Sequence, residues 1–308
     1  MKEQLLSLIE QGFPTMEEPM PRGDMPGDKI FYSEDSFDKA QTLYKELISR
    51  VDFETEDKII ISVSGGSGSG KTTLASILAF YFEKAGVGTY ILSGDNYPHR
   101  IPEYNDAERV QIYRDAAQKA LVEQGLYNED VKAILEHIYQ VFNDGSLDYL
   151  SQYDWYQTYH LAGKRALADY LGTDKELNIP AINRVLKEFK EGHDHIWLKR
   201  MGRTPDALWY DQVDFSNKKI MILEWTHGNH ADLRGIDFRL FLNSTPAETM
   251  AYRKLRARDG HADSAFVTMV LGIEQEKLHQ QSPMADLIFS KEGVVLDYDQ
   301  YLSLIEGA

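Results

Sequence analysis

Residues 58–82 read KIIISVSGGSGSGKTTLASILAFYF and contain the pattern G-x-x-x-x-G-K-[ST]. The β-branched run at 59–63, just before the glycines, predicts a buried parallel strand. After the glycines, apolar side chains fall at i, i+3, i+4 and i+7 from Leu74, which predicts a helix. The order of strand, glycine loop and helix is the context in which this motif binds phosphate. A glycine-rich turn before a structural helix is the weaker alternative, because flexible linkers do not sit between such elements.

The loop supplies the groups that a nucleotide needs. Its glycines let backbone N–H groups converge on phosphate oxygens, and the helix N-terminus adds partial positive charge. Lys71 is expected to reach the β- and γ-phosphates, and the Thr72 hydroxyl to complete a magnesium shell. In an empty loop Lys71 is expected to face solvent. The predicted nucleotide contacts are Gly65, Gly66, Ser67, Gly68, Ser69, Gly70, Lys71, Thr72 and Thr73.

Composition narrows the classes of function. The 308 residues suffice for one large domain or a core with an insertion, and 43% of them are hydrophobic. A net charge of −16 argues against nucleic acid as a partner and favours a small-molecule acceptor. No apolar run has the length of a membrane span, so no membrane partner is expected. Zero cysteines exclude disulfides and thiolate chemistry, and with the charged N-terminus they predict a cytoplasmic location. A homodimer is left open.

The N-terminal region, 1–55, is expected to be a helical arm that packs on the core. Residues 1–13 predict a short helix, and 14–28 hold four of the ten prolines, which predicts an extended arm or loop. A helix through about Val51 follows, capped by Asp35 or Ser36.

A second strand is predicted at 89–93, followed by Gly94-Asp95-Asn96-Tyr97-Pro98-His99-Arg100. Ligands of open parallel sheets lie at the carboxyl ends of the strands, so Asp95 would face the γ-phosphate as the catalytic base. A turn or helix-capping aspartate is the alternative. We assign the acceptor side to Tyr97, His99 and Arg100.

Residues 103–180 have a helical pattern and are expected to form an insertion that acts as a substrate lid. Tyr149, Tyr153, Tyr156 and His160 form an aromatic stripe at helical spacing. Such a stripe is usually core, and the alternative is a wall on which a base or sugar ring stacks. The kinase core would then comprise 56–102 and 181–308.

The C-terminal part of the core contains one acidic residue at a strand end and, further along, a cluster of arginines. A third strand at 218–224 ends in Glu224, a Walker-B-like position for organising Mg²⁺. A fourth strand is predicted at 238–242, and a last strand or hairpin at 285–296. The helix from Ala247 carries Arg253, Arg256 and Arg258, which suit a lid that closes on phosphate; a solvated basic face is the alternative.

Two histidine pairs invite a metal hypothesis. They are His193 with His195 and His227 with His230. No cysteine or carboxylate cluster completes a ligand set, so structural roles are preferred.

Several of these stretches resemble the uridine kinase and phosphoribulokinase family. The loop from Ser64 to Thr73 looks like its P-loop, and GDNYPHR at 94–100 is similar to its G-D-S-F-H-R stretch with one residue extra. EWTHG at 224–228 resembles its E-G-L-H-G, although Trp225 replaces a glycine, and Arg258-Asp259 falls at its Arg-Asp lid motif. The match covers about 58–100 and 183–300. LSGDNYPHR with DAER also resembles adenylylsulfate kinases, but the later motifs do not.

The resemblance implies an α/β, nucleoside-monophosphate-kinase-like P-loop fold with a parallel sheet, ATP as donor, Mg²⁺, and Asp95 as the base. The first hypothesis is a kinase that phosphorylates a hydroxyl of a nucleoside or a sugar-phosphate-like metabolite, with Lys71, Asp95 and Arg258 as catalytic residues. Adenylylsulfate kinase activity is the second. A nucleotide-switched P-loop ATPase that binds a protein partner is the alternative from another class.

Overall fold

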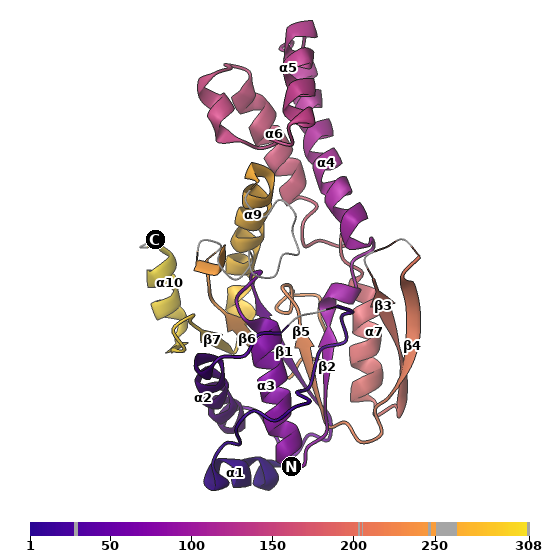
Figure 1. Ribbon diagram of the computed structural model, residues 1–308, viewed down its shortest axis with the longest axis vertical. Helices are drawn as coiled ribbons and strands as arrows, with labels where there is room; N and C mark the ends of the chain where they lie inside the picture. The colour runs from indigo at the N-terminus through magenta and orange to yellow at the C-terminus, as the bar shows by residue number, and fades with distance from the viewer. Residues whose placement is uncertain (28–29, 203, 205, 246–247, 251–263, 307–308) are drawn as a thin grey trace. The chain divides into compact units, whose positions relative to one another are not determined.

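The computed structural model describes residues 1–27, 30–202, 204, 206–245, 248–250 and 264–306 (Figure 1). The chain divides into two compact units, each built from separate stretches. The sheet unit comprises Met1–Tyr97, Asn178–Thr245 and Leu278–Ala308, and the helical unit comprises Pro98–Leu177 and Pro246–Lys277. Residues 1–55, expected as an arm, belong to the sheet unit.

The sheet unit contains a six-stranded sheet in the order β2-β5-β1-β6-β7-β8. Within this sheet, β2, β5, β1, β6 and β7 pair in parallel, and β8 is antiparallel to β7. The predicted α/β class with a mostly parallel sheet is therefore confirmed. Of the two possibilities predicted for 285–296, a last strand or a hairpin, β7 and β8 form the hairpin. The strands are β1 (Ile59–Gly65), β2 (Thr89–Ser93), β5 (Ile220–Glu224), β6 (Phe238–Leu242), β7 (Leu287–Phe289) and β8 (Val295–Leu296).

The central strands are buried on both faces, because helices cover the sheet. α1 (Lys2–Gln11), α2 (Glu34–Arg50) and α3 (Lys71–Lys84) share one hydrophobic core with alternate residues of β1, β5 and β6. α7 (Ile179–Lys190) packs against β1 and β3 (His195–Met201). α10 (Tyr298–Glu306) contributes Tyr301, whose ring contacts Phe241. The cap of α2 is Ser33, whose side chain accepts from the Ser36 N–H, in place of the predicted Asp35 or Ser36.

An antiparallel hairpin forms a second small sheet that the sequence did not predict. β3 pairs with β4 (Leu208–Asp214), with His195 opposite Asp214 and Met201 opposite Leu208. β4 is largely exposed, whereas the last four residues of β3 are buried.

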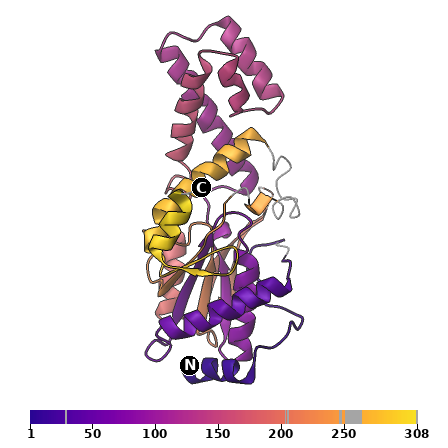
Figure 2. The same cartoon turned by 90° about the vertical axis from the view of Figure 1, so that its left-hand side faces the viewer.

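The helical unit is built from α4 (Pro102–Glu123), α5 (Glu129–Gln140), α6 (Tyr156–Ala168) and most of α9 (Ala265–Gln281). α4 and α6 pack along each other (Figure 2). The aromatic stripe is not one helix, because Tyr149 lies in the 3-10 turn η2 (Leu147–Ser151). Of the stripe, Tyr156 is fully buried and His160 is 9% exposed, as the preferred core interpretation requires, whereas Tyr149 and Tyr153 are half-buried. No helix of the described ranges combines the length and apolar character needed to cross a membrane. The lid role of residues 103–180 stays a prediction.

Candidate active site

The glycine loop joins β1 to α3 in the predicted way. Gly65 has φ of 148°, and a Cβ at this position would lie 2.7 Å from the carbonyl oxygen of Leu242 on the neighbouring strand. Only glycine therefore fits the point where the loop leaves the sheet. Gly70 caps α3 in the left-handed conformation, and no side chain caps the helix. The first N–H groups of α3 thus have no carbonyl one turn back and are suited to an anion.

Lys71 is not solvent-facing, as the sequence had suggested. Its side chain is buried, with 9% of the residue exposed, and Nζ donates a hydrogen bond to the carbonyl oxygen of Gly66 at 3.0 Å. The amine thus lies folded over the glycine loop, which is the surface that phosphates would occupy. A nucleotide would replace this carbonyl as the acceptor.

Thr72 and Glu224 form a buried pair beside the loop. The Thr72 hydroxyl donates to Glu224 Oε1 at 3.2 Å, and the two residues are 6% and 4% exposed. The register explains the pairing, because Glu224 ends β5 between Val63 of β1 and Ser93 of β2. A carboxylate and a hydroxyl oxygen are ligands that Mg²⁺ accepts together with phosphate oxygens. These two residues therefore fit the implied metal.

Asp95 lies at the same edge of the sheet. It is exposed in the 3-10 turn η1 (Gly94–Asn96), two residues beyond Ser93, which is paired with Glu224. The parallel register therefore places the P-loop, Glu224 and the Asp95 turn at the carboxyl ends of three adjacent strands.

Trp225 explains why glycine precedes Asp95. A Cβ on Gly94 would lie 2.0 Å from Cγ of Trp225, whose side chain is 2% exposed. The tryptophan that departs from the family pattern therefore packs directly on the Asp95 turn. The ring of His227 meets the ring of Trp225 edge-on at 5.5 Å.

Gly94→Ala is accordingly expected to destabilise the protein by about 1–3 kcal/mol, the usual range for overpacking, and to lower turnover by moving the Asp95 turn. Thermal unfolding and acceptor phosphorylation would be measured together. Gly272→Ala on α9 is the control, because no heavy atom lies within 4 Å of its added Cβ. A Gly94→Ala protein with unchanged unfolding temperature would contradict the packing.

The residues assigned to the acceptor side belong to both units. Tyr97 is 1% exposed, and burial raises its pKa, so its ring is a core element of the sheet unit. His99 and Arg100 belong to the helical unit. The His99 ring contacts the Asp174 carbonyl at 2.9 Å, and Arg100 donates to Tyr170 Oη and Glu108, each at 3.2 Å. Contacts of these three residues with an acceptor stay predictions.

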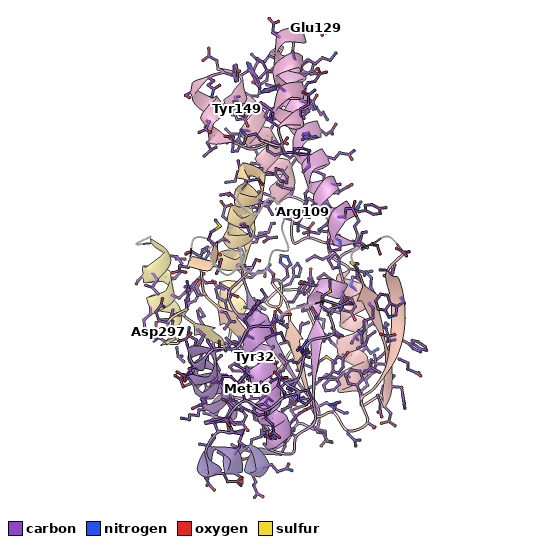
Figure 3. All side chains as sticks on the ribbon, viewed as in Figure 1. Met16, Tyr32, Arg109, Glu129, Tyr149 and Asp297 are labelled. Atoms are coloured by element: carbon purple, nitrogen blue, oxygen red, sulfur yellow. The ribbon has the colours of Figure 1, made fainter. Side chains whose placement is uncertain are left out.

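A buried ion pair anchors the same part of the helical unit. Arg109 on α4 (Figure 3) donates from Nη2 to Glu176 Oε1 at 2.6 Å, and the Glu176 side chain is 2% exposed. Glu176 also accepts from Asn105 Nδ2 at 2.8 Å and from the Gly172 N–H at 2.6 Å.

Two further predictions concern residues away from the loop, namely the basic cluster that would bind phosphate and the two histidine pairs that could suggest a metal. Arg253, Arg256 and Arg258 lie outside the described residues, so their phosphate role stays a prediction. Within the described ranges, no group of three or more His, Cys, Asp or Glu side chains could hold a metal ion.

The N-terminal segment reaches the site, which sequence reasoning missed. Tyr32 lies over α3 (Figure 3), its Oη 2.8 Å from Ser76 Oγ, and Thr73 Oγ1 donates to the Phe31 carbonyl at 3.3 Å. Asp24 is buried beside Ser93, at the start of the Asp95 turn. In the sequence Asp24 is one of four acidic residues in the proline-rich stretch 14–28, and this pattern predicts no contact.

Comparisons with known proteins identify the relatives of this chain. The bifunctional alpha-galactosidase/sucrose kinase AgaSK of Mediterraneibacter gnavus is 38% identical over 259 residues, 84% of this chain. The chain spans 23% of the length of that relative. The adenylyl-sulfate kinase of Escherichia coli (strain K12 / DH10B) is 38% identical over 73 residues, 22% of this chain and 36% of that protein. The predicted resemblance to P-loop kinases is confirmed, and the adenylylsulfate kinase match is local.

A solved structure described as a possible uridine kinase from Bacillus stearothermophilus covers 82% of this chain and 97% of its own. Its sequence identity to this chain is 15%, and the TM-score is 0.45. The model of the family described as Zeta toxin matches residues 45–203, just over half of the 308. The chain belongs to the Zeta toxin family.

Proposed function

We propose that the chain is an ATP-dependent kinase that phosphorylates a hydroxyl of a small molecule, with a sugar as the acceptor. The observation that carries the proposal is the buried Thr72–Glu224 pair, at 3.2 Å, between the glycine loop and the Asp95 turn. It places two oxygen ligands between the phosphate-binding loop and the exposed carboxylate of Asp95. The sucrose kinase named among the relatives supports a sugar hydroxyl over a nucleoside.

The residues divide the reaction between them. The loop N–H groups and Lys71 hold the β- and γ-phosphates, and Lys71 exchanges the Gly66 carbonyl for phosphate oxygen. Thr72 and Glu224 would hold Mg²⁺, which neutralises phosphate charge when bound. The acceptor oxygen forms the new P–O bond while the bond to the ADP oxygen breaks. Asp95 takes the acceptor proton onto a carboxylate oxygen. Catalysis is then mainly positioning and charge neutralisation.

A panel of acceptors tests the proposal. ADP release from Mg·ATP would be measured with sucrose, monosaccharides, sugar phosphates, nucleosides and adenylylsulfate, and the product identified by phosphorus NMR. We expect a sugar to stimulate turnover and to appear as a phosphate monoester. Stimulation by adenylylsulfate or by a nucleoside alone would replace the sugar with that acceptor.

Slow ATP hydrolysis that no small molecule changes would instead favour the nucleotide-switch alternative. The cytoplasmic location and the homodimer stay predictions.

A further inference from the structure

Asp24 forms a buried hub of hydrogen bonds at the end of β2. Its Oδ1 accepts the Ser93 N–H at 2.7 Å and Asn96 Nδ2 at 3.2 Å. Its Oδ2 accepts from Arg200 Nη1 at 2.8 Å and from Tyr90 Oη at 3.0 Å. The side chains of Asp24 and Arg200 are each 8% exposed, so the ion pair is withdrawn from water.

The groups that Asp24 holds are the two ends of the Asp95 turn. Ser93 precedes the turn and Asn96 closes it, and these residues are 1% and 0% exposed. Asn96 Oδ1 also accepts the Met201 N–H of β3 at 2.9 Å. The exposed Asp95 thus stands on a turn whose flanks are fixed from the N-terminal segment and from β3.

Stability alone is a weak reason for this arrangement. Burial raises the pKa of the Asp24 carboxyl, and the Arg200 guanidinium acts in the opposite direction. A buried ion pair can often be replaced by apolar side chains without loss of stability, because desolvation offsets the attraction. What four directed hydrogen bonds add is a fixed geometry. Catalytic groups need placement within about 0.5 Å, and that precision comes from neighbours that lock them.

We propose that Asp24, paired with Arg200, is a positioning residue that holds the Asp95 turn in the geometry for proton acceptance. The proposal rests on the proposed function, since Asp95 must act as the base. It assigns a role in the reaction to a residue 71 positions before Asp95 in the sequence.

A double-mutant cycle tests the proposal with sucrose or the acceptor that the panel identifies. Asp24→Ala is expected to lower kcat by about 10- to 100-fold, the cost of a misplaced catalytic group, with the KM for ATP changed less than about 3-fold because the glycine loop is untouched. In an Asp95→Asn background, Asp24→Ala should lower kcat by less than about 2-fold, because residues that act as a unit are not additive.

Asp237→Ala is the matched control. Like Asp24, Asp237 accepts a strand N–H, that of Ile60 at 2.7 Å, and forms an ion pair, with Lys190 at 2.9 Å. It lies at the amino end of β1, whereas the glycine loop follows the carboxyl end of that strand. It should lower the unfolding temperature and leave kcat within about 2-fold, since it lies away from the reacting groups.

Three results would overturn the positioning role. They are an unchanged kcat for Asp24→Ala, an equal loss in both backgrounds, and a loss matched by Asp237→Ala. If Asp24→Ala does not fold, Asp24→Asn replaces it, since it keeps the shape and removes the ion pair. The role of Asp95 as the base is tested separately, by measuring the turnover of the Asp95→Asn single variant. If that variant keeps normal turnover, the base assignment is wrong whatever Asp24 does.

Discussion

Asp95→Asn is expected to lower acceptor phosphorylation by about 10²-fold or more, the scale of a lost general base, while ATP still binds. The substitution keeps the shape of the side chain and removes the proton acceptor. Asp95 is exposed, so the fold should not change. Nucleotide binding should persist because the loop groups and the Thr72–Glu224 pair remain in place.

Single-turnover phosphorylation and ATP titration would be measured on the same protein. Asp214→Asn is the control, because Asp214 is likewise an exposed aspartate at the end of a strand and accepts the Ser216 N–H at 2.8 Å. ATP affinity that falls in step with the rate would identify Asp95 as a metal ligand. Unchanged phosphorylation would remove it from the mechanism.

Lys71→Ala is expected to abolish transfer, a loss of about 10³-fold or more, because a charge-assisted contact to the transferring phosphate can be worth several kcal/mol. Unlike the expectation from sequence, the substitution also affects folding. Lys71 is buried and donates to the Gly66 carbonyl, and losing one such hydrogen bond costs about 1 kcal/mol. A fall of a few degrees in the unfolding temperature should therefore accompany the lost activity.

Steady-state turnover and thermal unfolding would separate the two effects. Lys84→Ala is the control, since Lys84 ends the same helix and pairs with the exposed Glu17 far along α3 from the loop. Near-normal turnover of Lys71→Ala would show that the glycine loop does not hold the transferred phosphate. A total loss of folding would show that the lysine is mainly structural.

The sheet was predictable where burial on both faces made short apolar runs. β2 and β6 have the predicted bounds, 89–93 and 238–242, and β1 differs only at its carboxyl end. The position of Glu224 beside the loop also followed from sequence, because parallel strands end at one edge. These features depend on local pattern and a general rule of topology.

The β3–β4 hairpin and Asp24 were not predictable, for different physical reasons. β4 is mostly exposed and carries two aspartates, so it lacks the alternation that marks a strand. Asp24 lies in a stretch without periodicity, and its ion partner Arg200 is 176 residues further along the chain. Lys71 was misplaced because its hydrogen bond to Gly66 depends on the folded loop.

The pairing of β1 has a consequence for the newly made chain on the ribosome. β1 lies between β5 and β6, and Phe238, the partner of Ile61, follows it by 177 residues (238 − 61). At about 5–20 residues per second of synthesis, this apolar strand has no sheet partner on that side for roughly 9–35 s. During that interval an unpaired strand edge is a target for chaperones and for other unfinished chains. Slower translation before residue 238 would lengthen this exposure without changing one residue of the protein.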